Sequence, residues 1–313
     1  MRWPISIPSV LWSAVVGVVV VAVFAAVAGC SSTHHDTTRT GWMRTGCPSR
    51  PLRVVVSIGQ WSDLVQTLVG DCGDVVTLVP GTAGDPHDHE ATPSDAAAVD
   101  RADLVVANGL GYDAWASSLL HSSSHRVDVV EAARVAGARP GSNPHLWYDP
   151  AVVERMGADV ERVLVRRLPN ARSVLEKGRA AWQVSMRRYL AAVARTKGVV
   201  ARHRYVASES VFERMGVALG MLDATPPGYA SATANGSEPG PGDVFDFEQV
   251  LRRDRPSVLV VNPQTSGALP GSMRTVAIRL GVPIVEFRET EPAHTRFVDW
   301  QIGQLDALAG ALR

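Results

Sequence analysis

Short runs of apolar, largely β-branched residues alternate with longer amphipathic stretches over most of this chain, and this alternation restricts its possible folds more than any other feature. A run of four to eight such residues bounded by glycine or proline is typical of a buried strand, whereas apolar residues at every third or fourth position are typical of a helix. Strands and helices in alternation predict parallel sheets with helices on both faces. We therefore expect an α/β fold.

The predicted strands fall into two groups, one in each half of the chain. They are expected at residues 52–58, 75–79, 104–107, 199–207, 217–222, 258–261 and 284–287. Helices are expected at residues 61–69, from Pro93 with Thr92 as its cap, from Pro150 with Asp149 before it, and at residues 210–215, 245–253, 272–280 and 295–312.

A long amphipathic segment, residues 170–196, separates the two groups of strands. Asn170 is expected to cap this helix and Gly198 to stop it. A helix of this length does not fit a tight βα unit, so we interpret it as a rigid connector between two lobes. The expected division is residues 51–168 for the first lobe, 169–198 for the connecting helix and 199–313 for the second lobe.

One stretch of the second lobe lacks the periodicity of a helix or a strand. Residues 223–242 are rich in glycine, proline, serine and threonine. Such a composition is typical of a long surface loop, which we expect here.

The N-terminal end indicates export. No charged residue lies between Arg2 and Asp36, and residues 10–28 are almost wholly apolar. Small residues lead directly to Cys30, which resembles the bacterial lipobox, in which the chain is cleaved before the cysteine that receives lipid. We expect a signal peptide at residues 1–29, lipidation of Cys30 and a flexible tether at residues 30–50. The alternative is an uncleaved transmembrane helix, and both alternatives place residues 31–313 outside the cytoplasm.

The other two cysteines, Cys47 and Cys72, would then lie in an oxidising compartment, where a pair usually forms a disulfide. Cys47 shortly precedes the strand at residues 52–58, and Cys72 shortly precedes the strand at residues 75–79. If these strands are parallel neighbours, their starting ends lie together. Two free thiols or a metal bound by cysteine are the alternatives, and no further cysteine or histidine at zinc-finger spacing supports a metal.

Four loops next to the predicted strands carry a histidine or a carboxylate, and open parallel sheets bind ligands at the carboxyl ends of their strands. The candidate residues are His87, His145, Glu209 and Glu289, two from each lobe. Two imidazoles and two carboxylates that converge in a cleft would neutralise a divalent cation and bind it through nitrogen and oxygen. Taken singly, each has a plainer explanation, such as an exposed histidine or a carboxylate near a helix N-terminus.

Short motifs occur in order along the chain and join these candidates into a pattern. Residues 85–95 read DPHDHEATPSD, 102–104 read ADL, 108–109 read NG, 144–150 read PHLWYDP, 208–209 read SE and 289–290 read ET. The pattern, which spans roughly residues 52–312, resembles the solute-binding proteins of manganese and zinc ABC importers.

The resemblance implies two lobes joined by one long helix, with a metal site in the interlobe cleft formed by His87, His145, Glu209 and Glu289. Many zinc-binding members have a third histidine where this chain has Glu209, and a histidine-rich loop that residues 121–125 reproduce at best in part. A larger share of carboxylates favours Mn²⁺ or Fe²⁺, although Zn²⁺ accepts such ligands readily. The choice between Zn²⁺, Mn²⁺ and Fe²⁺ therefore stays open. His89 is interpreted as a solvated loop residue, with a role beside the metal as the alternative.

The expected function is that of a monomeric, lipid-anchored binding protein on the outer face of the cell membrane, which captures zinc or manganese and delivers it to the permease of an ABC importer. Balanced charge, with 31 basic and 31 acidic residues, argues against binding nucleic acid. A secreted metal-dependent hydrolase is the alternative, but it requires an open coordination position, and no Gly-x-Ser-x-Gly or His-Glu-x-x-His motif is present. We therefore do not expect an enzyme. A surface adhesin with a metal site is a further alternative.

Overall fold

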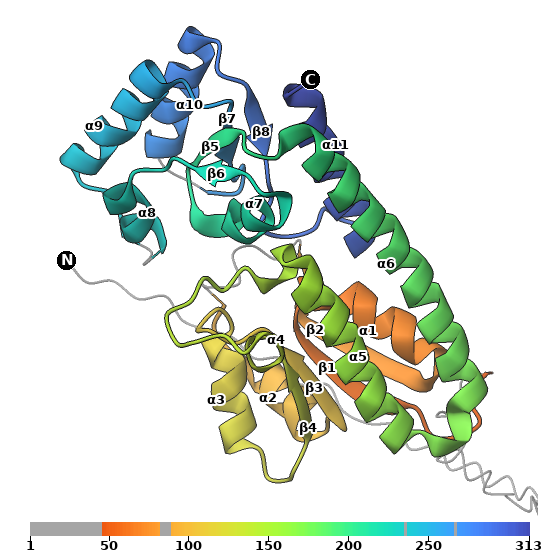
Figure 1. Cartoon of the computed structure of the whole chain (residues 1–313). Coiled ribbons are helices and arrows are strands. Elements are labelled where there is room, and N and C mark those ends of the chain that lie inside the picture. Colours follow the sequence, from red (N-terminus) through yellow and green to blue (C-terminus); the bar gives the residue numbers. More distant parts are fainter. Residues whose placement is uncertain (1–45, 82–88, 235–236, 266–267) are drawn as a thin grey trace, which may run out of the picture. The chain divides into compact units, whose positions relative to one another are not determined.

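The computed structural model describes residues 46–81, 89–234, 237–265 and 268–313, and within this part of the chain it contains two four-stranded parallel sheets (Figure 1). The first sheet has the order β2-β1-β3-β4 and the second the order β6-β5-β7-β8. We call the elements around the first sheet the first lobe and those around the second sheet the second lobe. The predicted α/β fold with two lobes is confirmed, and both lobes belong to one compact unit, residues 41–313.

The strands of the first lobe are β1 (Leu52–Ile58), β2 (Gly73–Val79), β3 (Leu104–Ala107) and β4 (Asp128–Glu131). Those of the second lobe are β5 (Arg204–Ala207), β6 (Leu222–Asp223), β7 (Val258–Val261) and β8 (Ile284–Glu286). The central strands β3 and β7 are buried along their whole length, because helices cover both faces of each sheet. Continuous apolar runs are therefore the right sequence for them.

The helices of the first lobe are α1 (Ser62–Val69), α2 (Pro93–Asp100), α3 (Ala114–Ser122), α4 (Ala132–Ala136) and α5 (Pro150–Arg167). Those of the second lobe are α7 (Glu213–Leu219), α8 (Pro227–Ala234), α9 (Pro241–Gln249), α10 (Ala268–Leu280) and α11 (Phe297–Ala311), and a π-helical turn at Val250–Asp254 follows α9. The start of α5 is set locally, since the Asp149 side chain accepts hydrogen bonds from the backbone of Ala151 and Val152 and Pro150 occupies the first helical position.

The connector is the 29-residue helix α6 (Arg172–Val200), which packs on α1 and α5 of the first lobe and on α7 and α11 of the second (Figure 1). Its predicted ends were wrong. A 3₁₀ turn at Pro169–Ala171 comes first, so Ala171 and not Asn170 precedes the helix. The helix continues through Gly198, which does not adopt the left-handed conformation of a helix-ending glycine, and Val200 is fully buried in the core.

Further predictions were wrong because tertiary packing outweighed the local pattern. The strand expected at residues 199–207 begins only at Arg204, since Val199 and Val200 end α6. The strand β4 was missed. In the strand expected at residues 217–222, residues 217–219 instead end α7, where Leu219 is buried and Val217 is 74% exposed, and only Leu222 lies in a strand, β6. The loop expected at residues 223–242 contains α8 and the start of α9, and the ring of Tyr229 packs on that of Phe247 with 4.5 Å between centroids.

Cys47 and Cys72 form a disulfide with 5.0 Å between their Cα atoms. Leu52 of β1 pairs with Gly73 of β2, so the two cysteines lie at the starting ends of adjacent parallel strands. The disulfide connects the segment that precedes β1 to the first lobe. The expected signal peptide and Cys30 lie outside the described residues, as does most of the expected tether. Among the residues that are described, none of the helices combines the length and the apolar character needed to cross a bilayer.

Candidate metal site

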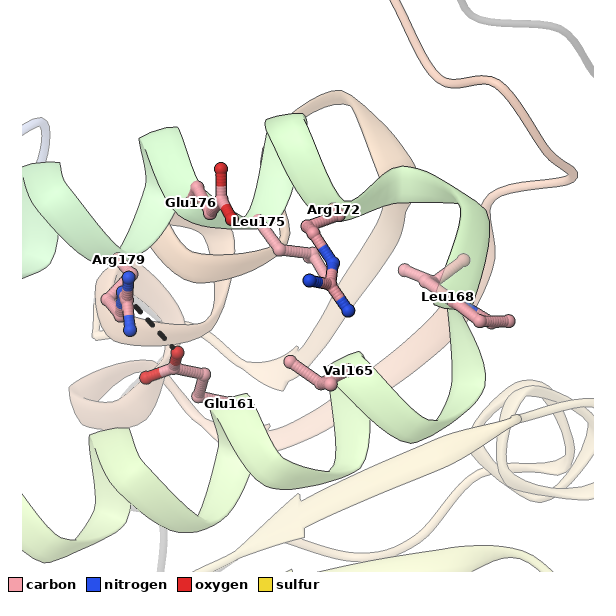
Figure 2. A pocket seen from close by; sticks show the side chains of 8 residues that line it. Glu161, Val165, Leu168, Arg172, Leu175, Glu176 and Arg179 are labelled. Atoms are coloured by element: carbon pink, nitrogen blue, oxygen red, sulfur yellow. Dashed lines mark ion pairs between the residues drawn. The ribbon is translucent and has the colours of Figure 1, made fainter.

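A pocket of about 220 Å³ between α5 and α6 does not have the side chains of a metal site (Figure 2). Its wall is apolar at Val165, Leu168 and Leu175, and Glu161 and Arg179 form an ion pair of 3.7 Å across it. The described lining contains neither histidine nor cysteine. The polar groups that could bind a cation lie elsewhere, at the carboxyl ends of the strands in the second lobe.

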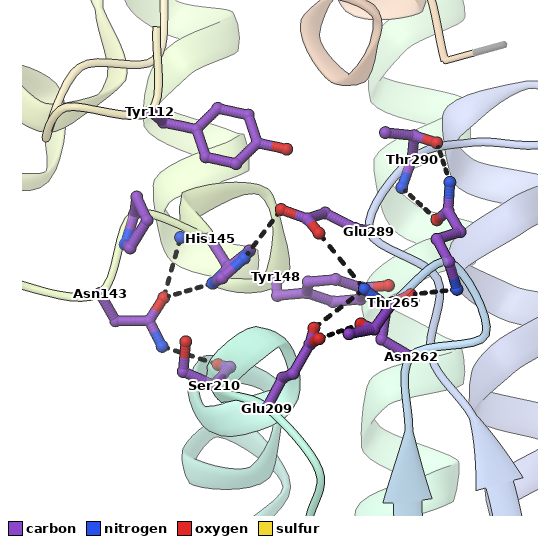
Figure 3. A network of polar contacts seen from close by, with 12 residues as sticks. Tyr112, Asn143, His145, Tyr148, Glu209, Ser210, Asn262, Thr265, Glu289 and Thr290 are labelled. Carbon is purple, nitrogen blue, oxygen red and sulfur yellow. Dashed lines mark hydrogen bonds and ion pairs between the residues drawn. The ribbon is translucent and has the colours of Figure 1, made fainter. Parts of the chain in front are cut away.

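Three adjacent strands of the second lobe, β5, β7 and β8, deliver three polar side chains to the same edge of the sheet. Glu209 follows β5, Asn262 follows β7 and Glu289 follows β8 (Figure 3). His145 comes from the first lobe, directly before the 3₁₀ turn Leu146–Tyr148 that leads to α5. The edge of one sheet and a loop of the other lobe thus meet at these four residues.

His145 and Glu289 are in contact across the two lobes. The distance from His145 Nε2 to Glu289 Oε1 is 3.2 Å, and the two side chains are 8% and 12% exposed. Trp147 and Tyr112, both almost fully buried, pack edge-on against the imidazole with 5.3 and 6.0 Å between ring centroids. These rings restrict the orientation of the imidazole.

The tautomer of His145 follows from its other neighbour, Asn143. The Nδ2 of Asn143 donates to Ser210 O and to Glu213 Oε2, each at 2.7 Å, which orients the amide. Its Oδ1 is therefore the acceptor that lies 2.7 Å from His145 Nδ1 and 2.9 Å from the His145 amide nitrogen. Nδ1 carries hydrogen, and in the neutral ring Nε2 directs its lone pair at Glu289.

This arrangement attracts a positive charge. A lone pair and a carboxylate oxygen at 3.2 Å repel each other unless a proton or a cation lies between them. A divalent metal ion that bound both atoms would convert this repulsion into two favourable contacts. The pair is therefore suited to coordinate a cation.

Asn262 connects the two carboxylates. Its Nδ2 donates to Glu209 Oε2 at 3.0 Å and to Glu289 Oε2 at 3.2 Å, as Figure 3 shows. Glu209 also accepts a hydrogen bond from the hydroxyl of Thr265 at its other oxygen, Oε1. Glu209 is thus linked to the pair of His145 and Glu289 through the Asn262 amide. Among the described residues, no three histidine, cysteine or acidic side chains lie close enough together to hold a metal ion.

The loop after β8 is held by residues of the first lobe. Gln60 Nε2, in the first lobe, donates to Glu289 O at 3.1 Å, and Thr290 Oγ1 donates to Gly81 O at 2.8 Å. Tyr148 OH donates to Arg288 O at 2.5 Å, and burial raises the pKa of Tyr148 well above its ordinary value, so it remains a neutral donor. Glu289 is thus fixed from several sides.

The candidate ligands from the sequence have different outcomes. His145 and Glu289 come into direct contact, and Glu209 lies one hydrogen-bonded residue away. His87 lies outside the described residues; Gly81, the last described residue before its loop, is bound by Thr290. The interpretation of His89 as a solvated residue was wrong, because its Nε2 lies 3.2 Å from Asp95 Oδ2 and its ring packs edge-on against Trp115.

Sequence reasoning missed Asn143 and Asn262. The predicted ligands are histidines and carboxylates near strand ends, whereas both asparagines have neutral amide side chains. Asn262 nevertheless comes directly after the predicted strand at residues 258–261. Its position is similar to that of Glu209, which follows β5 after one intervening residue. Including amide side chains at strand ends would have found it.

The sequence and the fold of this chain are similar to those of known proteins. The family model described as "ZnuA: Zinc-uptake complex component A periplasmic" matches residues 54–311. The manganese-binding lipoprotein MntA of Halalkalibacterium halodurans is 31% identical over 162 residues, which are 50% of each chain. The high-affinity zinc uptake system protein ZnuA of Bacillus subtilis is 26% identical over 145 residues, 40% of this chain and 45% of that one.

The chain thus spans about half the length of the curated relatives it matches. Among solved structures, the periplasmic zinc-binding protein TroA of Treponema pallidum is similar over 84% of this chain and 99% of that one, with a TM-score of 0.70 and 21% identity. At that identity the likeness supports the two-lobed fold alone.

Proposed function

Because this chain belongs to the family of the periplasmic zinc-uptake complex component A, we propose that it captures a divalent transition-metal ion outside the cytoplasm and delivers it to an ABC importer. The proposed ligands are His87, His145, Glu209 and Glu289. The observation that carries the proposal is the contact of His145 Nε2 with Glu289 Oε1 across the two lobes, which a divalent cation between the two atoms would stabilise.

The donor set indicates the class of ion. Imidazole nitrogen and carboxylate oxygen bind Zn²⁺, Mn²⁺ and Fe²⁺, whereas sites for Ca²⁺ and Mg²⁺ use oxygen almost alone. Two carboxylates balance the charge of one divalent ion, which lowers the cost of burying it. Relatives that are named for manganese and for zinc support the same class.

Binding fits the site better than hydrolysis. A metallohydrolase needs an open coordination position for water and a base that accepts its proton. Here Asn262 and Thr265 donate hydrogen bonds to Glu209, and Asn262 also donates to Glu289. These contacts restrict both carboxylates, as the proposed ligand role requires.

The proposed ligands can be tested by the thermal stability of the purified chain with and without Zn²⁺ or Mn²⁺. A ligand at 100 times its Kd stabilises the folded state by about 2.7 kcal/mol. His145→Ala and Glu289→Ala should lose this stabilisation. His121→Ala, an exposed histidine on α3, should keep it. A His145→Ala protein that metal stabilises as strongly as the wild type would contradict the proposal.

We further propose that lipid at Cys30 anchors the chain to the outer face of the cell membrane, where it acts as a monomer beside the permease of the importer. The names of two lipoprotein relatives support an anchored form. Replacing Cys30 with alanine should move the protein from the membrane fraction to the soluble fraction. Mass spectrometry of the mature N-terminus measures the lipid directly, and a Cys30→Ala protein that stays in the membrane would favour the transmembrane alternative.

A further inference from the structure

The position of Asn262 is a consequence of sheet order. β7 lies between β5 and β8 in the second sheet, so the residue that follows β7 lies between the carboxylates that follow its two neighbours. Asn262 is 4% exposed. It therefore interacts with the two carboxylates rather than with solvent (Figure 3).

The orientation of the Asn262 amide is set by its own loop. Its Oδ1 accepts a hydrogen bond from the backbone of Gln264 at 3.0 Å, so Nδ2 is the atom that points at the carboxylates. Nδ2 has two hydrogens, and it has two acceptors, Oε2 of Glu209 and Oε2 of Glu289. One asparagine thus engages one oxygen of each of the two proposed carboxylate ligands.

We propose that Asn262 is a positioning residue that keeps Oε2 of Glu209 and Oε2 of Glu289 hydrogen-bonded, which disfavours two-oxygen binding of a metal by either carboxylate and thereby favours Zn²⁺ over Mn²⁺. The inference rests on the proposed function. An oxygen that already accepts a hydrogen bond from a fixed amide is a poorer donor to a metal, and rotation of the carboxylate toward two-oxygen binding would break that bond. Glu289 then binds through Oε1, the oxygen that faces His145.

The number of donor oxygens separates the two ions. Zn²⁺ is satisfied by four ligands and accepts carboxylate through a single oxygen, whereas Mn²⁺ has no preference for low coordination and suits oxygen-rich sites of six ligands. Carboxylates that bind through one oxygen supply few donors. The wild-type site therefore suits the ion of lower coordination number.

Thr265 adds the same restraint at Glu209. Its hydroxyl donates to Oε1, while Asn262 donates to Oε2, so both oxygens of this carboxylate accept hydrogen bonds from the loop after β7. Loss of the Thr265 hydroxyl should thus free one oxygen of Glu209, and loss of the Asn262 amide should free one oxygen of each carboxylate.

The experiment measures the Kd of Zn²⁺ and of Mn²⁺ by competition with a metal-chelating dye for four versions of the full chain: wild type, Asn262→Ala, Thr265→Val and Asn170→Ala. Asn170 is exposed in the turn before α6, which makes it a matched control. Asn262→Ala should lower the preference for Zn²⁺ over Mn²⁺ at least tenfold, Thr265→Val should lower it by a smaller factor, and Asn170→Ala should leave it unchanged. X-ray absorption of the bound ion should show more oxygen neighbours in Asn262→Ala.

The outcomes separate the two proposals. A wild type that binds neither ion overturns the proposed function. A wild type that binds both ions, with a preference that Asn262→Ala leaves within twofold, overturns the role of Asn262 alone. If Asn262 had only a structural role, Asn262→Ala would weaken the binding of both ions equally. The ratio of the two Kd values therefore distinguishes this case from the proposed role. If Asn262→Ala fails to fold, Thr265→Val decides the question, since valine has nearly the shape of threonine.

Discussion

Arg214, in α7 of the second lobe, donates from Nε to the backbone carbonyl of Asn143 in the first lobe over 3.0 Å. Asn143 in turn accepts from the ring of His145, so a residue of the second lobe helps to orient a proposed ligand from the first. Burial lowers the pKa of the half-buried Arg214, while Asp149 and Glu213 act in the opposite direction. The same loop of the first lobe is thus held by helix α7, which begins after the short 3₁₀ turn Ser210–Phe212 that follows Glu209.

Arg214→Ala should weaken metal binding about tenfold, the lower end of the range for residues that orient metal ligands. The expected loss is small because Arg214 acts on His145 only through Asn143. Isothermal titration calorimetry with Zn²⁺ measures it. Arg188→Ala removes an exposed arginine, which is paired with Asp299 at 2.8 Å, and should leave affinity unchanged. Equal affinities in the two variants would show that Arg214 has no part in orienting the ligand.

Removing the disulfide by a Cys47→Ala and Cys72→Ala double substitution should destabilise the fold without changing metal affinity. The bridged residues are 25 apart in the chain, and closing a loop of this size in the unfolded state is worth about 3 kcal/mol. The bond lies at the starting ends of β1 and β2, and the proposed ligands lie past the carboxyl ends of strands. Urea unfolding gives the stability and calorimetry the affinity. A large loss of affinity in the folded variant would contradict this separation.

The sequence predicted those residues of the candidate site that follow a strand whose end is recognisable from the local sequence. Glu209 and Glu289 each follow a short apolar run within three residues, and parallel sheets collect such residues at one edge. What the sequence does not contain is the order of strands. Asn262 lies between the two carboxylates because β7 pairs with both β5 and β8, and this order depends on crossover connections rather than on any local pattern.

The prediction of strands and helices succeeded where a whole segment is buried. It failed where a contact with a distant segment determines the local structure. β3 and β7 have the predicted bounds, since every residue of each is buried. α8 was missed because its residues lack helical periodicity, and Tyr229 is its buried contact with Phe247 of α9. Such a contact between segments 18 residues apart leaves no local signal in either.

Asp95 should make stability depend on pH in the acid range. Burial alone would raise the pKa of Asp95, but hydrogen bonds from Thr92 and the nearby His89 outweigh it and hold the pKa below its ordinary value. A carboxyl with a depressed folded-state pKa contributes stability above its unfolded pKa of about 3.9, and this contribution is lost as pH falls through the folded pKa. Asp95 and Thr92 form the capping box of α2, so the contribution belongs to the start of that helix.

Asp95→Ala should therefore cost about 1 kcal/mol at neutral pH, and the difference from wild type should shrink below about pH 4. Chemical unfolding at a series of pH values measures both. Asp306→Ala, an exposed aspartate on α11, should show neither effect. If the difference in unfolding free energy stayed constant down to pH 2, the substitution would act by removing packing and not by removing the ionised carboxylate of the capping box.

Two glycines on the connector α6 should respond in opposite directions to alanine. Alanine favours a helix over glycine by about 1 kcal/mol, and nothing lies within 4 Å of a Cβ added at Gly198, so Gly198→Ala should stabilise the protein by up to that amount. A Cβ at Gly178 would lie 2.6 Å from Thr67 O and also against Leu68 O, both in the backbone of α1. Forcing α1 and α6 apart costs about 1–3 kcal/mol, which exceeds the gain in helix propensity. Gly178→Ala should thus be destabilised in urea unfolding, and a stabilised Gly178→Ala would show that α6 does not pack this closely on the first lobe.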